Sequence, residues 1–194
     1  MTFARPKKRE PVGEAGLFEY AVGVLARKMR TVRDLRRLMR NRAEPGEEGE
    51  RAMDAVVARL KELKYLSDTK FAADYTRTRK ENEKFGKRRV QQDLMQKGVQ
   101  KELIATTLAA AYDEVDEVVL AREYVAKKRM KKPNGESAQK ETARVMGRLM
   151  RAGFSSSAIY KVLREWQVPV DVDAMEGGAD SDSYAERDED LPEF

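Results

Sequence analysis

Apolar residues recur at spacings of three and four along most of the chain, which is the period of one face of an α-helix. One segment shows this most clearly, with apolar residues at Met53, Val56, Val57, Leu60 and Leu63. No segment alternates apolar and polar residues over the length of a β-strand. The pattern therefore predicts an all-α protein.

A leucine–methionine pair occurs three times, each time near the end of a charged, helix-like segment. The leucines, Leu38, Leu94 and Leu149, are 56 and 55 residues apart. Gly98 and Gly153 follow the second and third pairs and suit the left-handed residue that ends a helix. A nearly constant period indicates one supersecondary unit built three times, each unit burying apolar surface against its neighbour. We therefore expect three tandem three-helix repeats in an elongated array.

The first repeat differs from the others at the end of its second helix. Thr31 is expected to cap the start of that helix, with Asp34 in the capping-box position. Arg42 and Ala43 stand where the other two repeats have a glycine and an apolar residue. We therefore expect this helix to end in a different way.

The chain ends differ from the body in composition. The first residues are rich in Lys, Arg, Pro and Gly and cannot bury a face. From Asp171 onward there are ten acidic residues and one basic residue, although the whole chain carries +5. The body is therefore strongly basic. The expected divisions are a basic flexible arm at 1–16, three-helix repeats at 17–64, 65–112 and 113–168, and an acidic disordered tail at 169–194.

Composition narrows the class of protein. Charged residues make up 38% of the chain, well above the ~25% that is typical of globular domains, which fits an extended body. Without cysteine or histidine, disulfides, thiolate nucleophiles, serine–histidine triads and the commonest zinc ligands are excluded. The acids between Asp113 and Glu117 lie at a helix junction, where capping explains them better than a magnesium site. We expect a binding protein, no enzyme, with no cofactor and no metal.

No apolar run approaches the ~18 residues needed to cross a bilayer, and no targeting signal is present. The sequence therefore predicts a cytoplasmic monomer with no membrane partner.

The central repeat carries a specific set of residues. A tyrosine–leucine pair, an aspartate, a phenylalanine–alanine pair and an arginine are followed by a glycine and a short basic helix. In this pattern the chain resembles the RecX family, and the repeat pattern extends the resemblance over residues 17–168. The residues that carry it are Tyr65, Leu66, Asp68, Phe71, Ala72, Arg79, Gly86, Arg89, Leu94, Gly98 and Val99.

The resemblance implies a curved array of three-helix repeats that regulates the RecA recombinase negatively. Members of this family lie in the groove of the RecA–DNA filament and inhibit its extension, ATPase activity and strand exchange. The implied partners are the RecA filament and single- or double-stranded DNA, in homologous recombination, DNA repair and the SOS response.

Basic clusters in the second and third repeats are the candidate contacts to DNA or RecA. Each cluster could instead be a solvated helix face, and Arg79 could form a structural ion pair with Asp68 or Asp74. The candidates are Arg77, Arg79, Lys80, Lys84, Lys87, Arg88, Arg89, Lys127, Lys128, Arg129, Lys131 and Lys132.

Other conspicuous residues have structural explanations. Tyr75 and Tyr124 could stack on bases, but each lies beside an apolar stripe, so packing is expected. Met39, Met95 and Met150 occupy equivalent repeat positions and are expected to pack between the units.

Two further functions stay open on sequence grounds. A general DNA-binding protein of helix-turn-helix type would use the same basic body, although a single recognition helix is not evident. A helical-repeat scaffold would bind proteins without nucleic acid. The acidic tail could compete with DNA for the basic body or serve only as a solubilising segment.

Overall fold

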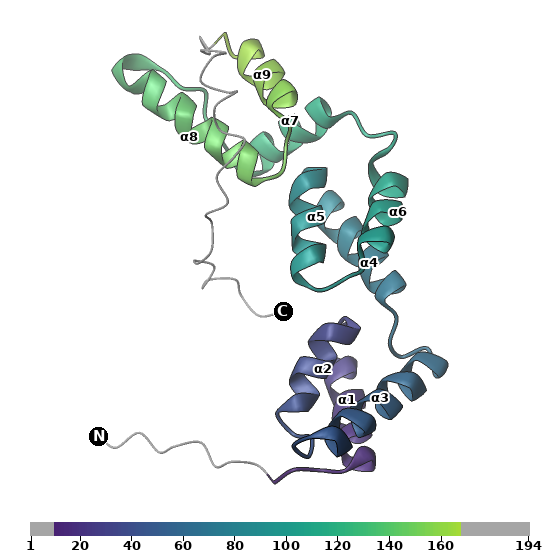
Figure 1. Ribbon diagram of the computed structural model, residues 1–194. Coiled ribbons are helices and arrows are strands. Elements are labelled where there is room, and N and C mark those ends of the chain that lie inside the picture. The colour runs from purple at the N-terminus through teal and green to yellow at the C-terminus, as the bar shows by residue number, and fades with distance from the viewer. Residues whose placement is uncertain (1–9, 168–194) are drawn as a thin grey trace, which may run out of the picture.

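The computed structural model describes residues 10–167, and within this range every regular element is helical. The elements form three consecutive units that follow one another along an elongated, curved array (Figure 1). In chain order they are α1 (Glu14–Arg27), α2 (Val32–Arg40) and α3 (Glu47–Glu62) in the first unit, α4 (Asp68–Glu81), α5 (Lys87–Gln96) and α6 (Lys101–Tyr112) in the second, and α7 (Glu117–Lys127), a short 3-10 helix (Gly135–Ser137), α8 (Ala138–Arg151) and α9 (Ser156–Glu165) in the third.

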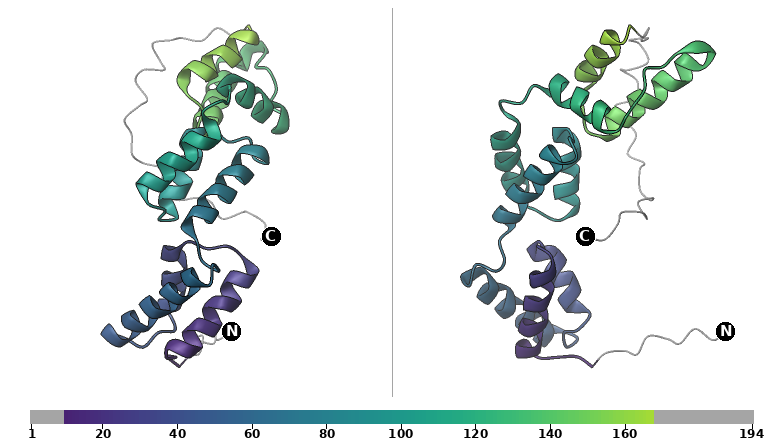
Figure 2. Two further views of the ribbon diagram at one scale, coloured as in Figure 1. Left: turned by 90° about the vertical axis from the view of Figure 1, so that its right-hand side faces the viewer. Right: turned by 180° about the vertical axis from the view of Figure 1, so that it is seen from behind.

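Each unit folds around a hydrophobic cluster of its own. Leu35 of α2, Leu94 of α5 and Leu149 of α8 are completely buried, one in each cluster. In every unit the first and third helices pack against each other, and the third helix also packs against the middle helix. The middle helices α2, α5 and α8 therefore share one side of the array, which is the inner side of its curve in both directions of view (Figures 1 and 2).

Side-chain caps start four of the helices. The Thr31 Oγ1 accepts a hydrogen bond of 3.1 Å from the Asp34 N–H, as the sequence predicts. Ser67 and Ser155 cap α4 and α9 in the same way, and Asp116 caps α7. Because these caps satisfy N–H groups that a helix leaves unpaired, they fix where each unit begins.

The ends of the middle helices confirm the expected difference between the units. Gly98 and Gly153 have φ values of +75° and +90°, and the residues after them return hydrogen bonds to Leu94 and Leu149. This is the arrangement that favours glycine after a helix. In the first unit, the Ala43 N–H instead donates to the carbonyl of Met39, without a left-handed residue.

The methionine prediction was wrong. Met39 is completely buried inside the cluster of the first unit, while Met95 and Met150 are 46% and 45% exposed. Counted from the start of each helix, Met39 occupies the position of Leu94, so the repeated pair is one residue out of step in the first unit. A shift of one residue turns a side chain by about 100° around the helix, which moves it between core and surface.

The first unit also starts earlier than expected. α1 begins at Glu14, and Val12 packs against the cluster of the first unit. The Val12 N–H donates a hydrogen bond of 2.8 Å to the carbonyl of Arg42. The end of the predicted arm therefore belongs to the fold, whereas residues 1–9 and the predicted acidic tail lie outside the described residues.

The second and third units share apolar contacts at their joint. Phe85 packs against both clusters, and its carbonyl accepts a hydrogen bond of 2.8 Å from the Tyr112 hydroxyl. The backbones also touch, because the Gly86 N–H donates to the Ala152 carbonyl at 2.8 Å. A side chain on Gly86 would collide with the Gly153 carbonyl. These two units therefore form one continuous block.

The joint between the first and second units is polar. The Thr31 hydroxyl donates to the Lys97 carbonyl at 2.7 Å, and the Val32 N–H donates to the Asp68 carboxylate at 2.9 Å. Among the described residues, none is shared between the two clusters on either side of this joint. Two hydrogen bonds at the start of α2 therefore connect the first and second units, whereas apolar contacts connect the second and third.

Buried tyrosines predict sensitivity to alkali. Burial raises the pKa of Tyr75 to about 12 and also raises the pKa of Tyr112, compared with about 10 in the unfolded chain. Each group therefore stabilises the fold fully below about pH 10, and this contribution is lost at higher pH, for Tyr75 as the pH rises toward about 12. We expect the free energy of unfolding, measured with urea, to fall over this range.

The Tyr112→Phe variant provides the control for this pH effect. At neutral pH it should be less stable by about 1 kcal/mol, because the hydrogen bond to the Phe85 carbonyl is lost. Its stability should then decline less steeply above about pH 10, because one titrating group is gone. An identical decline in the variant and the native protein would contradict the assignment.

Candidate functional site

A cleft of about 680 Å³ lies between the first and second units. α2 forms one wall, and residues from α4 and α5 form the other. We call it the inter-unit cleft. Two acidic residues, Asp34 and Asp93, also line it. Its eight basic residues are Arg30, Arg33, Arg36, Arg37, Arg40, Arg79, Arg89 and Lys97.

A row of arginines on α2 forms the first wall. Arg33, Arg37 and Arg40 are spaced by four and three residues, so they lie along one face of the helix. The side chain of Arg37 is 75% exposed, and its nearest carboxylate, Asp34, is 3.6 Å away. Arg33 crosses over Gly98, where an added Cβ would lie 2.2 Å from the Arg33 Nε. The absence of a side chain at Gly98 therefore lets α2 approach the end of α5.

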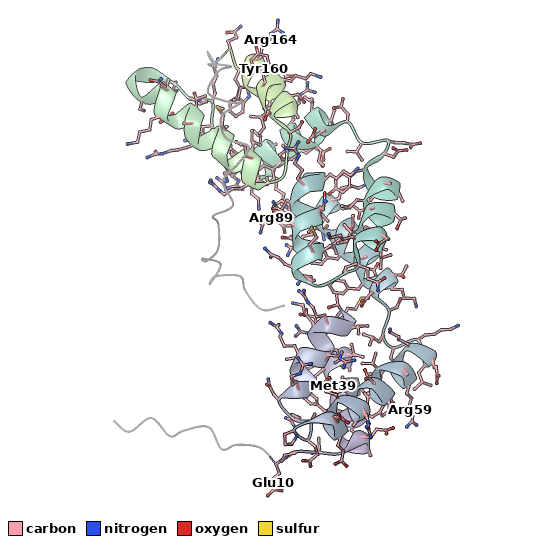
Figure 3. The ribbon with its side chains drawn as sticks, in the orientation of Figure 1. Glu10, Met39, Arg59, Arg89, Tyr160 and Arg164 are labelled. Atoms are coloured by element: carbon pink, nitrogen blue, oxygen red, sulfur yellow. The ribbon has the colours of Figure 1, made fainter. Side chains whose placement is uncertain are left out.

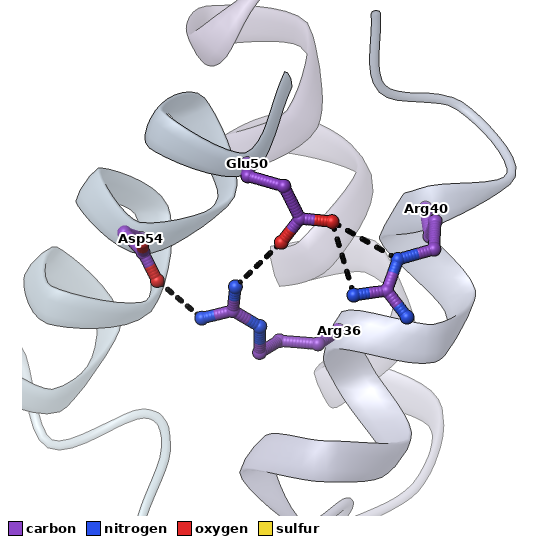
Figure 4. Close-up of polar contacts among 4 residues, drawn as sticks. All are labelled: Arg36, Arg40, Glu50 and Asp54. Atoms are coloured by element: carbon purple, nitrogen blue, oxygen red, sulfur yellow. Dashed lines mark hydrogen bonds and ion pairs between the residues drawn. The ribbon is translucent and has the colours of Figure 1, made fainter. Parts of the chain in front are cut away.

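Acidic residues of α3 hold the outer end of this row. Glu50 accepts hydrogen bonds from Arg36 at 2.8 Å and from Arg40 at 3.0 and 3.1 Å, and Arg36 also pairs with Asp54 (Figure 4). The hydrogen bonds from Arg36 and Arg40 lower the pKa of Glu50. These contacts fix α2 on α3 and orient two of the arginines.

A buried carboxylate organises the second wall. Asp93 of α5 is 8% exposed and accepts a hydrogen bond of 3.0 Å from the Tyr75 hydroxyl. The Nε atoms of Arg89 and Arg79 lie 3.1 and 3.8 Å from its oxygens. Figure 3 shows Arg89 on the side of α5 that faces the inside of the curve. Asp93 therefore holds two of the sequence-predicted arginines in the cleft.

The expected partners of Arg79 were wrong. Asp74 pairs with Arg77 at 3.3 Å, and Asp68 accepts the Val32 N–H of the first unit. Asp74 lies five residues before Arg79, a separation that does not place two side chains together on a helix. Arg79 turns instead across the Tyr75 ring, 4.9 Å from its centre, toward α5.

Three cations of the cleft have no carboxylate within ion-pair distance among the described residues: Arg30, Arg33 and Lys97. Burial lowers the pKa of Lys97; the charges of Asp34 and Asp93 oppose this shift, and the positive charges of Lys28 and Arg79 add to it. The Nε of Arg30 is buried without a hydrogen-bond partner in the described part of the chain. The cleft therefore holds positive charge that its own acids do not neutralise.

A second basic groove, of about 400 Å³, lies in the third unit. The segment after α7 contributes Arg129, Lys131 and Lys132, which the sequence predicts as contacts. α8 adds Arg144 and Arg148, which the sequence analysis missed. We call it the third-unit groove.

The other candidates are distributed between the joint and the surface. Lys84 pairs with Glu123 at 2.8 Å, and Lys128 pairs with Glu83 at 3.2 Å. Both ion pairs cross the joint between the second and third units, so these lysines have a structural role. Lys80 donates to the Ala111 carbonyl at 2.8 Å inside the second unit.

The remaining candidates lie on helix surfaces. Arg77 pairs with Asp74, and with Glu81 at 3.9 Å, along α4. Lys87 and Arg88 are exposed in the first turn of α5, and Lys127 is exposed at the end of α7.

Sequence reasoning missed most of the first wall of the inter-unit cleft. The signal was present, because Arg33, Arg37 and Arg40 follow helical spacing and share one face of α2. The spacing alone does not tell whether that face meets a neighbouring unit or solvent.

Within residues 10–167, no helix is long and apolar enough to cross a membrane. The same residues contain no group of three or more acidic side chains placed to hold a metal ion. The acids near Asp116 cap α7 and bind the start of α9, since Glu117 accepts the Ser155 N–H at 2.7 Å.

Fold and clefts together define a helical-repeat protein with basic clefts that its middle helices help to form. Residues 67–108 match the family model of the second three-helix domain of RecX, and residues 116–163 match that of the third. The second and third units are therefore similar to domains of the RecX family.

Curated relatives agree with this assignment. The chain is 34% identical over 113 residues to the regulatory protein RecX of Geobacillus thermodenitrificans, covering 58% of the chain and 41% of that relative. It is 35% identical over 111 residues to the protein of the same name from Mycolicibacterium smegmatis, covering 56% of the chain and 58% of the relative. The chain thus spans about two fifths to three fifths of the length of these relatives.

Solved structures support the fold. The crystal structure of RecX from Lactobacillus salivarius matches with a TM-score of 0.60 at 18% identity, covering 80% of this chain and 97% of that one. A second crystal structure of regulatory protein RecX matches with a TM-score of 0.61 at 24% identity, covering 78% of this chain and 71% of that one.

Proposed function

We propose that this protein is a non-catalytic, negative regulator of the RecA recombinase. It binds in the groove of the RecA–DNA filament and inhibits filament extension, ATPase activity and strand exchange. Similarity to the RecX family supports this role, because the similar curated proteins carry the name regulatory protein RecX. The proposed partners are the filament and its DNA, met by a cytoplasmic monomer.

The placement of the basic clefts carries the proposal. The inter-unit cleft and the third-unit groove both use the middle helices, which line the inner side of the curved array (Figure 1). The exposed Lys87 and Arg88 of α5 lie between them along the chain. A long, curved body with positive charge along its inner side suits a helical groove that exposes nucleic acid.

The mechanism requires occupancy and no bond-making. A chain held in the groove by several basic contacts excludes incoming RecA subunits and resists the movements that hydrolysis needs. Because ion pairs with phosphates release counterions, inhibition should weaken steeply as salt rises.

A titration of RecA's DNA-dependent ATPase tests the proposal. The native protein should lower the ATPase rate at near-stoichiometric amounts in low salt. The Lys87→Ala/Arg88→Ala double variant should need about tenfold more protein for the same inhibition, since two exposed positive charges of α5 are lost.

The Arg51→Gln/Arg164→Gln double variant is the matched control. Both arginines are exposed, on α3 and α9, and lie outside the two basic clefts. This control should inhibit like the native protein. Unchanged ATPase rates across a wide titration of the native protein in low salt would reject the proposed function.

A further inference from the structure

The inter-unit cleft has the charge of an anion site. Seven arginines and one lysine line it against two aspartates, and Asp93 is already engaged by Tyr75, Arg79 and Arg89. Arginine suits phosphate because its planar guanidinium offers several N–H donors in a fork. The cations without a carboxylate partner described above lie at the joint itself. A bound anion would therefore reduce the electrostatic repulsion among the basic side chains of the cleft.

The geometry of the α2 row favours a linear polyanion. Arg33, Arg37 and Arg40 span about 10 Å along the helix, at a rise of about 1.5 Å per residue. Phosphates of one strand of duplex DNA follow each other at about 3.4 Å along the axis, so the row covers about three of them.

The single aromatic residue of the cleft is not available to read bases. Tyr75 stacks on Phe71 with ring centres 5.6 Å apart, and Arg79 and Lys97 cover the ring at 4.9 and 5.3 Å. Its hydroxyl donates to Asp93. Base stacking in this cleft is therefore blocked, and recognition is restricted to the backbone.

The two walls belong to different units. α2 is part of the first unit, and Arg79, Arg89 and Lys97 are part of the second. The direct tie between these units is polar and lies at the start of α2. The second and third units are held together by the apolar contacts of Phe85, which, among the described residues, the joint between the first and second units lacks. An anion that contacts both walls of the cleft would connect the first and second units in place of such a core.

We propose that the inter-unit cleft binds the phosphodiester backbone of nucleic acid without regard to sequence, and that the bound strand fixes the angle between the first and second units. This inference rests on the proposed function for its biological setting. Its tests measure oligonucleotide binding and the angle between the units and need no ATPase assay, so the two can fail separately.

Binding of a fluorescent oligothymidylate to the full chain, followed by anisotropy at several salt concentrations, tests the site. The Arg33→Gln/Arg37→Gln double variant should bind about tenfold more weakly. The slope of log affinity against log salt should fall by about 1.4 in magnitude, because each lost phosphate contact of a single strand contributes about 0.7. An oligonucleotide of mixed sequence should give the same affinities.

Arg51→Gln/Arg164→Gln again removes two positive charges elsewhere and should leave both affinity and slope close to native. Equal weakening by the two double variants would overturn the site, because it would mean that net charge alone drives binding. Native oligonucleotide binding by Arg33→Gln/Arg37→Gln, with loss of its binding to DNA-free RecA, would also overturn it and would assign the cleft to an acidic protein surface.

The absence of native cysteines allows dye pairs to report the angle between units. Cysteines in place of the exposed Glu48 and Glu102 place one dye on α3 and one on α6. Addition of oligothymidylate should narrow the distribution of energy-transfer efficiency for this pair. A pair at Glu102 and Lys161, in the second and third units, should not change. Binding without narrowing, or narrowing that persists in Arg33→Gln/Arg37→Gln, would refute the coupling.

Discussion

Replacing Gly153 with alanine is expected to destabilise the protein by about 3 kcal/mol. Gly153 has a φ of +90°, which costs a residue with a side chain about 1 kcal/mol. An added Cβ would also lie 2.3 Å from the Arg89 backbone nitrogen and 2.9 Å from the Gly86 carbonyl oxygen. Backbone atoms cannot rotate aside, so the second and third units must separate at their joint. Urea unfolding measures the loss.

Two glycines of the third unit separate these causes. Gly135 has a φ of +69°, with no described atom within 4 Å of an added Cβ, so its change to alanine should cost only about 1 kcal/mol. Gly147 lies inside α8 near a flexible arginine end, and alanine there should stabilise by about 0.5 kcal/mol. If Gly153→Ala were no worse than Gly135→Ala, the close backbone contact would have no energetic importance.

Asp93→Asn should change stability and nucleic-acid binding in opposite directions. The substitution removes the carboxylate that Arg79 and Arg89 share, so two partly buried cations lose the negative charge that lies between them. We expect a loss of about 2 kcal/mol in the free energy of unfolding, less than for a fully buried pair because both arginines remain partly in water. Below the unfolding transition, oligonucleotide affinity should rise severalfold, because the cleft gains one net positive charge.

Asp74→Asn is the matched control on a neighbouring helix. Asp74 pairs with Arg77 on the exposed face of α4, and such pairs contribute at most about 0.5 kcal/mol. Its loss should affect neither stability nor binding measurably. Weaker oligonucleotide binding by folded Asp93→Asn would show that this carboxylate organises the arginines more than its charge repels the ligand.

Much of the fold follows from local patterns. Helical periodicity predicts the all-α class, and Thr31 and Gly98 mark helix ends that the structure confirms. Two local errors have simple causes. The segment from Glu14 is polar and small at first, so the start of α1 resembles a loop. The sequence comparison of the repeats paired Leu38 with Leu94 because both are leucine. In the structure the residue equivalent to the buried Leu94 is the buried Met39.

The basic clefts were only partly predictable. Arg79 and Arg89 were identified through the family resemblance, and both line the inter-unit cleft. The α2 arginines escaped because a cleft between units depends on which faces of two helices meet. That choice is made by distant contacts, here Thr31 with Lys97 and Arg33 with Gly98. Periodicity within one segment carries no information about such pairs.

The contrast between the two joints has a consequence for how the chain comes apart. A tandem array with equal interfaces loses its structure as a whole or frays from either end. Here Phe85 and the Gly86–Ala152 hydrogen bond join the second and third units into one block. The first unit has a separate core and is connected to this block by the Thr31–Lys97 and Val32–Asp68 hydrogen bonds. Denaturation should therefore release that third independently, and no single melting temperature describes the molecule.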